Sequence, residues 1–101
     1  MNTESLDKAV ATLGEQKDTW AQLPIREKIE FLRGLRRRTG EVADRWVEAA
    51  VRAKGIPLGS PWAGEEWFSG PYAFLYGINA IEKTMQDLAR GRVPDLKPGA
   101  V

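Results

Sequence analysis

The sequence predicts an all-α fold of four or five amphipathic helices. Apolar residues recur every three or four positions through most of the first 90 residues, and no segment predicts a strand. Glycine and proline, which end helices, gather at a few places between these periodic stretches. With 101 residues the chain forms one small domain at most, and its core is expected to be thin.

The first expected helix covers residues 4–22. Thr3 stands where an N-cap residue is favoured. Four apolar residues share one face at spacings of three, four or seven: Leu6, Val10, Leu13 and Trp20. Lys17 lies on the same face, where its aliphatic stem can cover apolar surface. Leu23 and Pro24 end the helix, because proline disfavours helical geometry in the residue before it.

The next segment continues the helical spacing up to Gly55, which suits a helix end. Its apolar positions are Ile25, Ile29, Leu32, Leu35, Val42, Trp46 and Ala50. Thr39 and Gly40 are poor helix formers in the middle of this pattern. We therefore expect two helices here, over residues 24–38 and 41–54.

The last expected helix covers residues 65–90. It follows a loop at 55–64 that contains three glycines and two prolines. Glu65 and Glu66 suit its first turn, because carboxylates stabilise the positive end of the helix dipole. Pro71 either re-initiates or kinks the helix.

The composition excludes several classes of function. Without Cys or His the chain has no thiol nucleophile, disulfide, zinc finger or imidazole ligand, so we expect no catalytic, cofactor-binding or metal-ligating residue. A net charge of +1 predicts no nucleic-acid partner, and Arg36, Arg37 and Arg38 are expected to be solvated or ion-paired. No apolar run approaches the roughly 20 residues that cross a bilayer, and no secretory signal is present. We expect a cytoplasmic protein with no membrane contact.

Four tryptophans are many for so short a chain. Trp20 and Trp46 lie in phase with apolar stripes and are expected in the core. Trp62 and Trp67 flank the loop and begin an aromatic stretch, where core packing, contact with a second surface, or the wall of an apolar channel all remain open. The candidate packing or channel contacts are Trp62, Trp67, Phe68 and Tyr72.

The order of these elements resembles the N-terminal helices of the aldehyde dehydrogenase superfamily over roughly residues 4–98. The residues that carry the resemblance are Leu6-Asp7-Lys8-Ala9-Val10, Trp20, Pro24-Ile25-Arg26-Glu27-Lys28-Ile29, Leu32, Leu35, Arg37, the helix from Val42 to Lys54, Pro71-Tyr72-Ala73-Phe74 and Arg92-Val93-Pro94. Three departures indicate a divergent branch, and one of them is a first helix that is more polar over residues 14–18 than the Ala-rich family version. The turn is Ala53-Lys54-Gly55-Ile56-Pro57 rather than Gly-Lys-Pro, and the stretch 57–70 is longer and more aromatic than the common form.

The resemblance implies an NAD- or NADP-dependent oxidation of an aldehyde to a carboxylic acid, in a family that is usually homo-oligomeric. Its chemistry uses a cysteine thiolate, a glutamate that activates water, and a Rossmann-like cofactor domain. This chain has no Cys, so we expect it not to be catalytic alone. The resemblance implies that residues 1–91 are the helical part of a larger α/β fold, and that 92–101 are an extended linker toward the missing cofactor-binding domain. Trp67 or Phe68 would approach the substrate entrance.

The alternative is a free-standing helical module that binds a protein partner and has no enzymatic activity. Such a module is expected to bury Trp62 and Trp67 or to offer them as one compact patch. A dehydrogenase fragment is expected instead to expose a broad apolar surface along Phe68 to Leu75, where it packs on the remainder of its chain.

Overall fold

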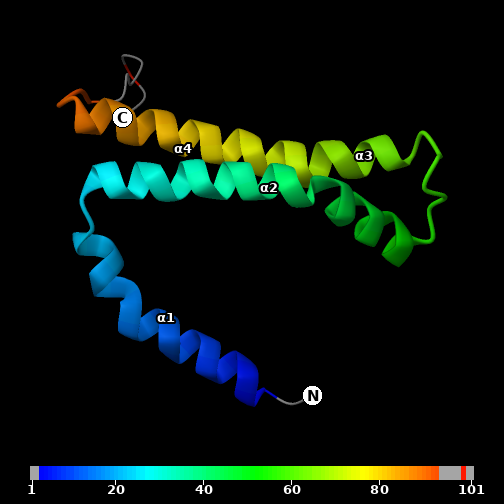
Figure 1. Cartoon of the computed structure of the whole chain (residues 1–101), viewed down its shortest axis with the longest axis horizontal. Coiled ribbons are helices and arrows are strands. Elements are labelled where there is room, and N and C mark those ends of the chain that lie inside the picture. The colour runs from blue at the N-terminus through cyan, green and yellow to red at the C-terminus, as the bar shows by residue number, and fades with distance from the viewer. Residues whose placement is uncertain (1–2, 94–98, 100–101) are drawn as a thin grey trace.

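The computed structural model describes residues 3–93 and 99, and all of its secondary-structure elements are helical (Figure 1). The elements are α1 (Glu4–Gln22), α2 (Ile25–Lys54), α3 (Ala63–Trp67), the π-helical segment η1 (Phe68–Tyr72) and α4 (Ala73–Ala89). No strand occurs among the described residues, which confirms the all-α class. Because α3, η1 and α4 follow one another without a break, this part of the chain forms three helical rods rather than the expected four or five helices.

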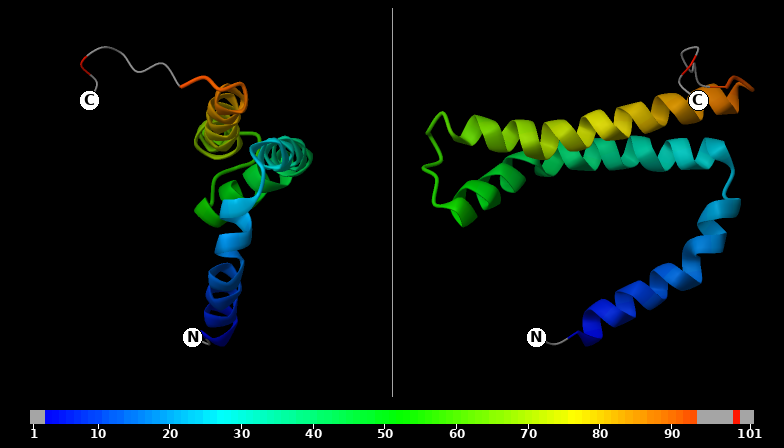
Figure 2. Two further views of the ribbon diagram at one scale, coloured as in Figure 1. Left: turned by 90° about the vertical axis from the view of Figure 1, so that its left-hand side faces the viewer. Right: turned by 180° about the vertical axis from the view of Figure 1, so that it is seen from behind.

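The second and third rods lie side by side and antiparallel, as the views in Figure 2 show. Gly55, at a φ of 67°, ends α2 in the left-handed conformation that glycine adopts without strain. The core between the rods is small. Its buried apolar residues are Ile29, Ala43, Val47, Val51, Ala63 and Ile78. Ile56 packs against the part of this core nearest the loop.

The expected break between residues 38 and 41 is wrong, because α2 is one continuous helix. Thr39 is buried, and its Oγ1 donates a hydrogen bond of 2.8 Å to the carbonyl oxygen of Leu35. Thr39 and Gly40 together cost roughly 1.5 kcal/mol of helix propensity relative to alanine. A break here would expose the buried face that continues from Thr39 to Ala43, so the packing of α2 on α4 outweighs local propensity.

The last rod runs from Ala63 to Ala89, so it begins two residues before the expected helix at 65–90 and ends one residue short of it, with Glu65 and Glu66 in its first turn. Pro71 does not re-initiate it. The proline lies inside η1, whose wider turn continues the rod, and the Ala73 N–H donates to the carbonyl oxygens of Gly70 and Phe68.

Helix α1 has the predicted bounds of 4–22, but it projects away from the helical pair (Figure 1). Its residues are all described and none is buried. Thr3 makes no side-chain capping bond. The expectation that Trp20 and Trp46 lie in the core is also wrong, since both remain substantially exposed. Periodicity identifies the apolar face of a helix, but it does not supply the surface that covers that face.

The expected linker at 92–101 lies mostly outside the described residues. Arg92 and Val93 follow α4 without helical structure. The Arg92 N–H donates a hydrogen bond of 2.8 Å to the Asp87 carbonyl oxygen, so the chain turns at the end of α4.

Candidate functional site

Large exposed apolar side chains gather in two places on the described chain. We call the first the aromatic row, which consists of Phe68, Tyr72 and Tyr76. We call the second the corner groove, which lies where α1 meets α2 and is built around Trp20, Phe31 and Leu35. Contiguous apolar surface outside the core is where proteins commonly bind partners or ligands, so these two places are the candidate sites.

The aromatic row crosses from η1 into α4. Its members are four residues apart, a spacing that places side chains one above another on a helix. The rings of Phe68 and Tyr72 stack with centroids 5.2 Å apart, and those of Tyr72 and Tyr76 with centroids 6.3 Å apart. Each residue is 56–68% exposed, and together with Ala73 they line a shallow groove of about 390 Å³. The row therefore presents a pre-ordered apolar ridge to its surroundings.

Only part of the sequence-predicted set comes together in this row. Phe68 and Tyr72 are in contact, whereas no ring contact joins Trp62 or Trp67 to them among the residues that the structure describes. Trp62 is exposed beside the loop, where its backbone N–H donates to Ser60 Oγ at 3.1 Å. The four candidates do not form one compact patch. Tyr76 was missed, although its four-residue spacing from Tyr72 was visible in the sequence.

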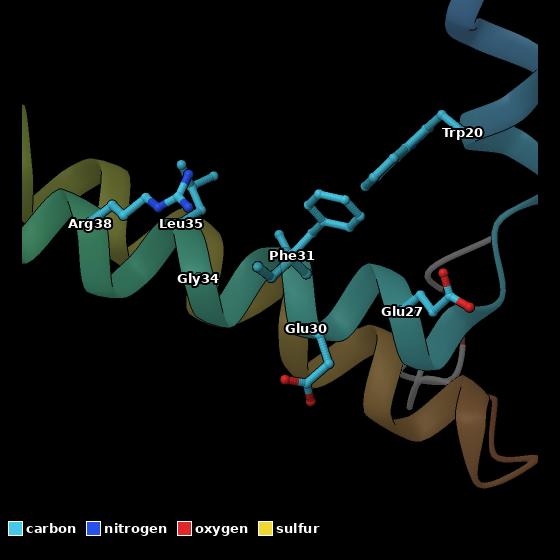
Figure 3. Close-up of a pocket in the computed structure, with 8 residues that line it drawn as sticks. Trp20, Glu27, Glu30, Phe31, Gly34, Leu35 and Arg38 are labelled. Atoms are coloured by element: carbon cyan, nitrogen blue, oxygen red, sulfur yellow. The ribbon is translucent and has the colours of Figure 1, made fainter.

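The corner groove joins the C-terminal end of α1 to the first half of α2 (Figure 3). The rings of Trp20 and Phe31 meet edge to face, with centroids 5.7 Å apart and planes at 68°. Lys28 braces the corner, because its Nζ lies 5.6 Å from the centre of the Trp20 ring and donates to the Ala21 carbonyl oxygen at 3.2 Å. The groove has a volume of about 680 Å³. Its other lining residues are Glu27, Glu30, Leu32, Gly34, Leu35 and Arg38.

A buried carboxylate ties α2 to α4. Glu82 is only 4% exposed, and it accepts hydrogen bonds from Arg33 Nε at 3.0 Å, Arg36 Nη1 at 2.6 Å and Gln86 Nε2 at 3.0 Å. The hydrogen bond to Glu82, followed by the one to Glu30, raises the pKa of Arg33 above its usual value. The expected ion pairing of Arg36 is confirmed. No buried polar atom of the described side chains lacks a hydrogen-bond partner, so this cluster serves to position the two helices.

A second ion pair lies at the loop end of the helical pair. Lys54 Nζ donates to Glu66 Oε1 at 2.6 Å, and Glu66 is buried. This hydrogen bond raises the pKa of Lys54 above 10.5. Glu65 is exposed, so the two neighbouring carboxylates diverge, as expected for adjacent residues of a helix. The sequence indicated the helix-dipole position of Glu66 but gave no sign of its partner.

Two further kinds of feature, a metal site and a membrane-spanning helix, are absent from the described residues. Across 3–93 and 99, no three Asp or Glu residues converge in a way that could hold a metal ion. Over the same residues, none of the helices combines the length and the hydropathy required to span a bilayer. Comparison with protein-family models, with curated proteins and with solved structures finds no match.

Proposed function

We propose that this chain is the N-terminal helical region of an aldehyde dehydrogenase-like protein, in which it packs on the cofactor domain. The complete protein would oxidise an aldehyde to a carboxylic acid with NAD or NADP in the cytoplasm. The residues described here serve as scaffold in this proposal. Their two buried carboxylates, Glu66 and Glu82, are both held by basic side chains, and the chain has no cysteine to act as nucleophile.

The observation that carries the proposal is the aromatic row. A free-standing module is expected to bury Trp62 and Trp67 or to gather them into one patch. This chain does neither. The chain instead exposes apolar residues along η1 and the start of α4, from Phe68 to Tyr76. This is the broad surface expected of a segment that packs on a larger domain, because such a surface gains free energy only when it is covered.

The first experiment is to determine the nucleotide sequence that follows the codon for Val101. The proposal is supported if the same frame, or a frame restored by one insertion or deletion, encodes strands, a glycine-containing cofactor turn and a cysteine in a loop. An authentic stop codon followed by unrelated sequence overturns the dehydrogenase proposal. The free-standing interaction module then becomes the better account.

A second experiment tests the row itself. The 101-residue chain is expected to bind a hydrophobic dye, with fluorescence that falls in the variant Tyr72→Ser, because the middle ring of the row is removed. Leu58→Ser is the matched control, since Leu58 is exposed in the loop. Equal fluorescence from both variants and the unaltered chain would show that the row is not the dye-binding surface.

A further inference from the structure

The face of α1 that meets α2 at the corner groove is apolar along the helix and has no cover. Its apolar members share spacings of three, four or seven residues and are 47–70% exposed: Leu6, Val10, Leu13 and Trp20. At about 100° per residue, Lys17 is the one charged side chain of α1 that lies on this face. The carboxylates of α1 lie about 100° or more around the helix from the centre of the face.

The face of α2 that meets Trp20 is also apolar. Helices α1 and α4 lie on different sides of α2, so α4 does not cover this face (Figures 1 and 2). Its apolar residues Phe31, Leu35 and Val42 are 36–60% exposed and recur at spacings of four and seven. The two faces therefore offer apolar surface from two directions to anything that lies between them.

The charges along the two faces are unbalanced. Lys17, Arg38 and Arg45 are exposed, and none of them forms an ion pair within the part of the chain that the structure describes. Within about 60° of the centre of the α2 face, the other charged residues are Lys28, which braces the corner, and Glu27. An occupant of this place meets net positive charge, which acidic side chains beside its own apolar residues would complement.

The geometry suits a helix as the occupant. The extended residues Leu23 and Pro24 and the contact of Trp20 with Phe31 hold α1 at an angle to α2, and no residue of α1 is buried. The apolar face of α1 extends about 21 Å from Leu6 to Trp20, which is the length of about four helical turns. Sites for small molecules enclose most of the ligand, whereas only two helices bound this one. Grooves of this kind bind amphipathic helices through apolar residues at three- and four-residue spacing.

We propose that the corner groove and the two faces beside it bind an acidic amphipathic helix of a partner protein. The apolar residues of the partner helix pack between the apolar face of α1 and the side chains of Phe31 and Leu35. Its carboxylates meet Lys17, Arg38 and Arg45. A membrane is a poorer occupant, because the two apolar faces meet at an angle in the corner and do not lie in one plane.

This interaction goes beyond the proposed function and uses a different surface. The aromatic row on η1 and α4 stays free for the cofactor domain. The binding of an acidic helix can therefore fail while the dehydrogenase proposal stands, because the downstream reading frame tests the latter independently.

The test uses the 101-residue chain and a dye-labelled synthetic peptide of about 18 residues. Leucines at every third or fourth position form the apolar face of the peptide, glutamates flank them, and alanines fill the other positions. A second peptide has lysine in place of every glutamate. Fluorescence anisotropy is expected to show saturable binding of the glutamate peptide that weakens as salt is added. The lysine peptide is expected to bind at least about 10-fold more weakly.

Two pairs of variants test where the peptide binds. Arg38→Glu is expected to raise the Kd on the order of 10-fold. Arg26→Glu makes the same charge change about 160° around α2 from the apolar face and is expected to leave the Kd within about threefold. Leu13→Ser is expected to raise the Kd on the order of 10-fold, whereas Ala11→Ser, on the other side of α1, is expected to leave it unchanged. All four side chains are exposed, so the variants are expected to keep the helical content of the unaltered chain by circular dichroism.

Four results would overturn the proposal. The first is the absence of saturable binding of the glutamate peptide, and the second is equal binding of the lysine peptide. The third is binding that Arg38→Glu and Leu13→Ser leave unchanged or that Tyr72→Ser abolishes, because the peptide would then lie elsewhere. The fourth is self-association of the chain, or its sedimentation with phosphatidylserine vesicles, that Leu13→Ser abolishes. That result would assign these faces to a second copy or to a lipid surface.

Discussion

Mutations around Glu82 can separate two costs: the loss of a buried charge, and the loss of the partners of a buried charge that remains. The Glu82 side chain is 6% exposed, whereas the side chains of its partners Arg33 and Arg36 are 48% and 44% exposed. Glu82→Gln removes the buried charge and leaves two arginines that water can solvate. The double variant Arg33→Met with Arg36→Met leaves the buried carboxylate with a single hydrogen bond, from Gln86. The double variant is therefore expected to be the less stable of the two.

The magnitudes follow from these exposures. Removing the partners of a buried charge costs about 3–5 kcal/mol, because the charge stays in a site of low polarity. Glu82→Gln replaces one acceptor oxygen by an amide NH2, so it loses at least one charge-assisted hydrogen bond of about 1.5–3 kcal/mol, and partial solvation of the freed arginine keeps the total near about 2 kcal/mol. The triple variant, in which Arg33, Arg36 and Glu82 are all Met, is expected within about 1 kcal/mol of the unaltered chain.

Urea unfolding followed by circular dichroism at neutral pH measures these differences. In a chain of this size, 2 kcal/mol corresponds to roughly 10 °C in Tm, so thermal unfolding gives an independent ranking. The reasoning is refuted if Glu82→Gln is as destabilising as the double arginine variant. It is also refuted if the triple variant is as unstable as the double variant, because the cost would then come from lost packing of the arginine stems.

Two further predictions concern the helical pair. Because its hydrogen bond to Glu66 raises the pKa of Lys54 above 10.5, the stabilisation from this pair is fully present below pH 10.5 and is lost as the pH rises through the folded-state pKa. Urea midpoints are expected to fall over that range. The fall is expected to be smaller in Lys54→Arg, because a guanidinium keeps its proton there. Identical pH profiles for the variant and the unaltered chain would contradict this. Gly40→Ala is expected to stabilise the chain by about 1 kcal/mol, since its Cβ meets no atom within 4 Å. Gly70→Ala places a Cβ 3.2 Å from Trp46 Nε1. Its free energy of unfolding is therefore expected to be at least about 1 kcal/mol below that of Gly40→Ala, and its tryptophan fluorescence is expected to shift. Equal stabilities of the two variants would contradict this.

The elements that the sequence predicts well are those with local causes. Pro24 ends the first helix by its own geometry, and the bounds 4–22 are those of α1. The continuity of α2 has a distant cause. Thr39 is buried because α4, formed by residues about 40 positions later, packs on that face of α2. Propensity alone predicted a break at that point, and tertiary packing overrode it.

The candidate surfaces were less predictable, because they depend on how helices are placed relative to one another. Phe31 lies outside the predicted apolar stripe of its helix, and its contact with Trp20 exists only because of the angle at the corner. Glu82 gave no signal, because a glutamate in a helical pattern is expected in water. The stacking of Phe68 on Tyr72 was accessible from spacing, although the π-helical turn between them was not.

The described residues place their ion pairs between the helices and most of their large apolar side chains on the surface. Glu82 with its arginines and Glu66 with Lys54 lie toward opposite ends of the helical pair, so together they fix its register. Buried ion pairs add little net stability, since desolvation offsets most of their attraction. The apolar core is confined to a few small side chains, while the larger aromatic residues lie on the aromatic row and in the corner groove. These larger side chains therefore add little hydrophobic stabilisation to the fold as described, and covering them is expected to stabilise the chain more than filling any site in its core.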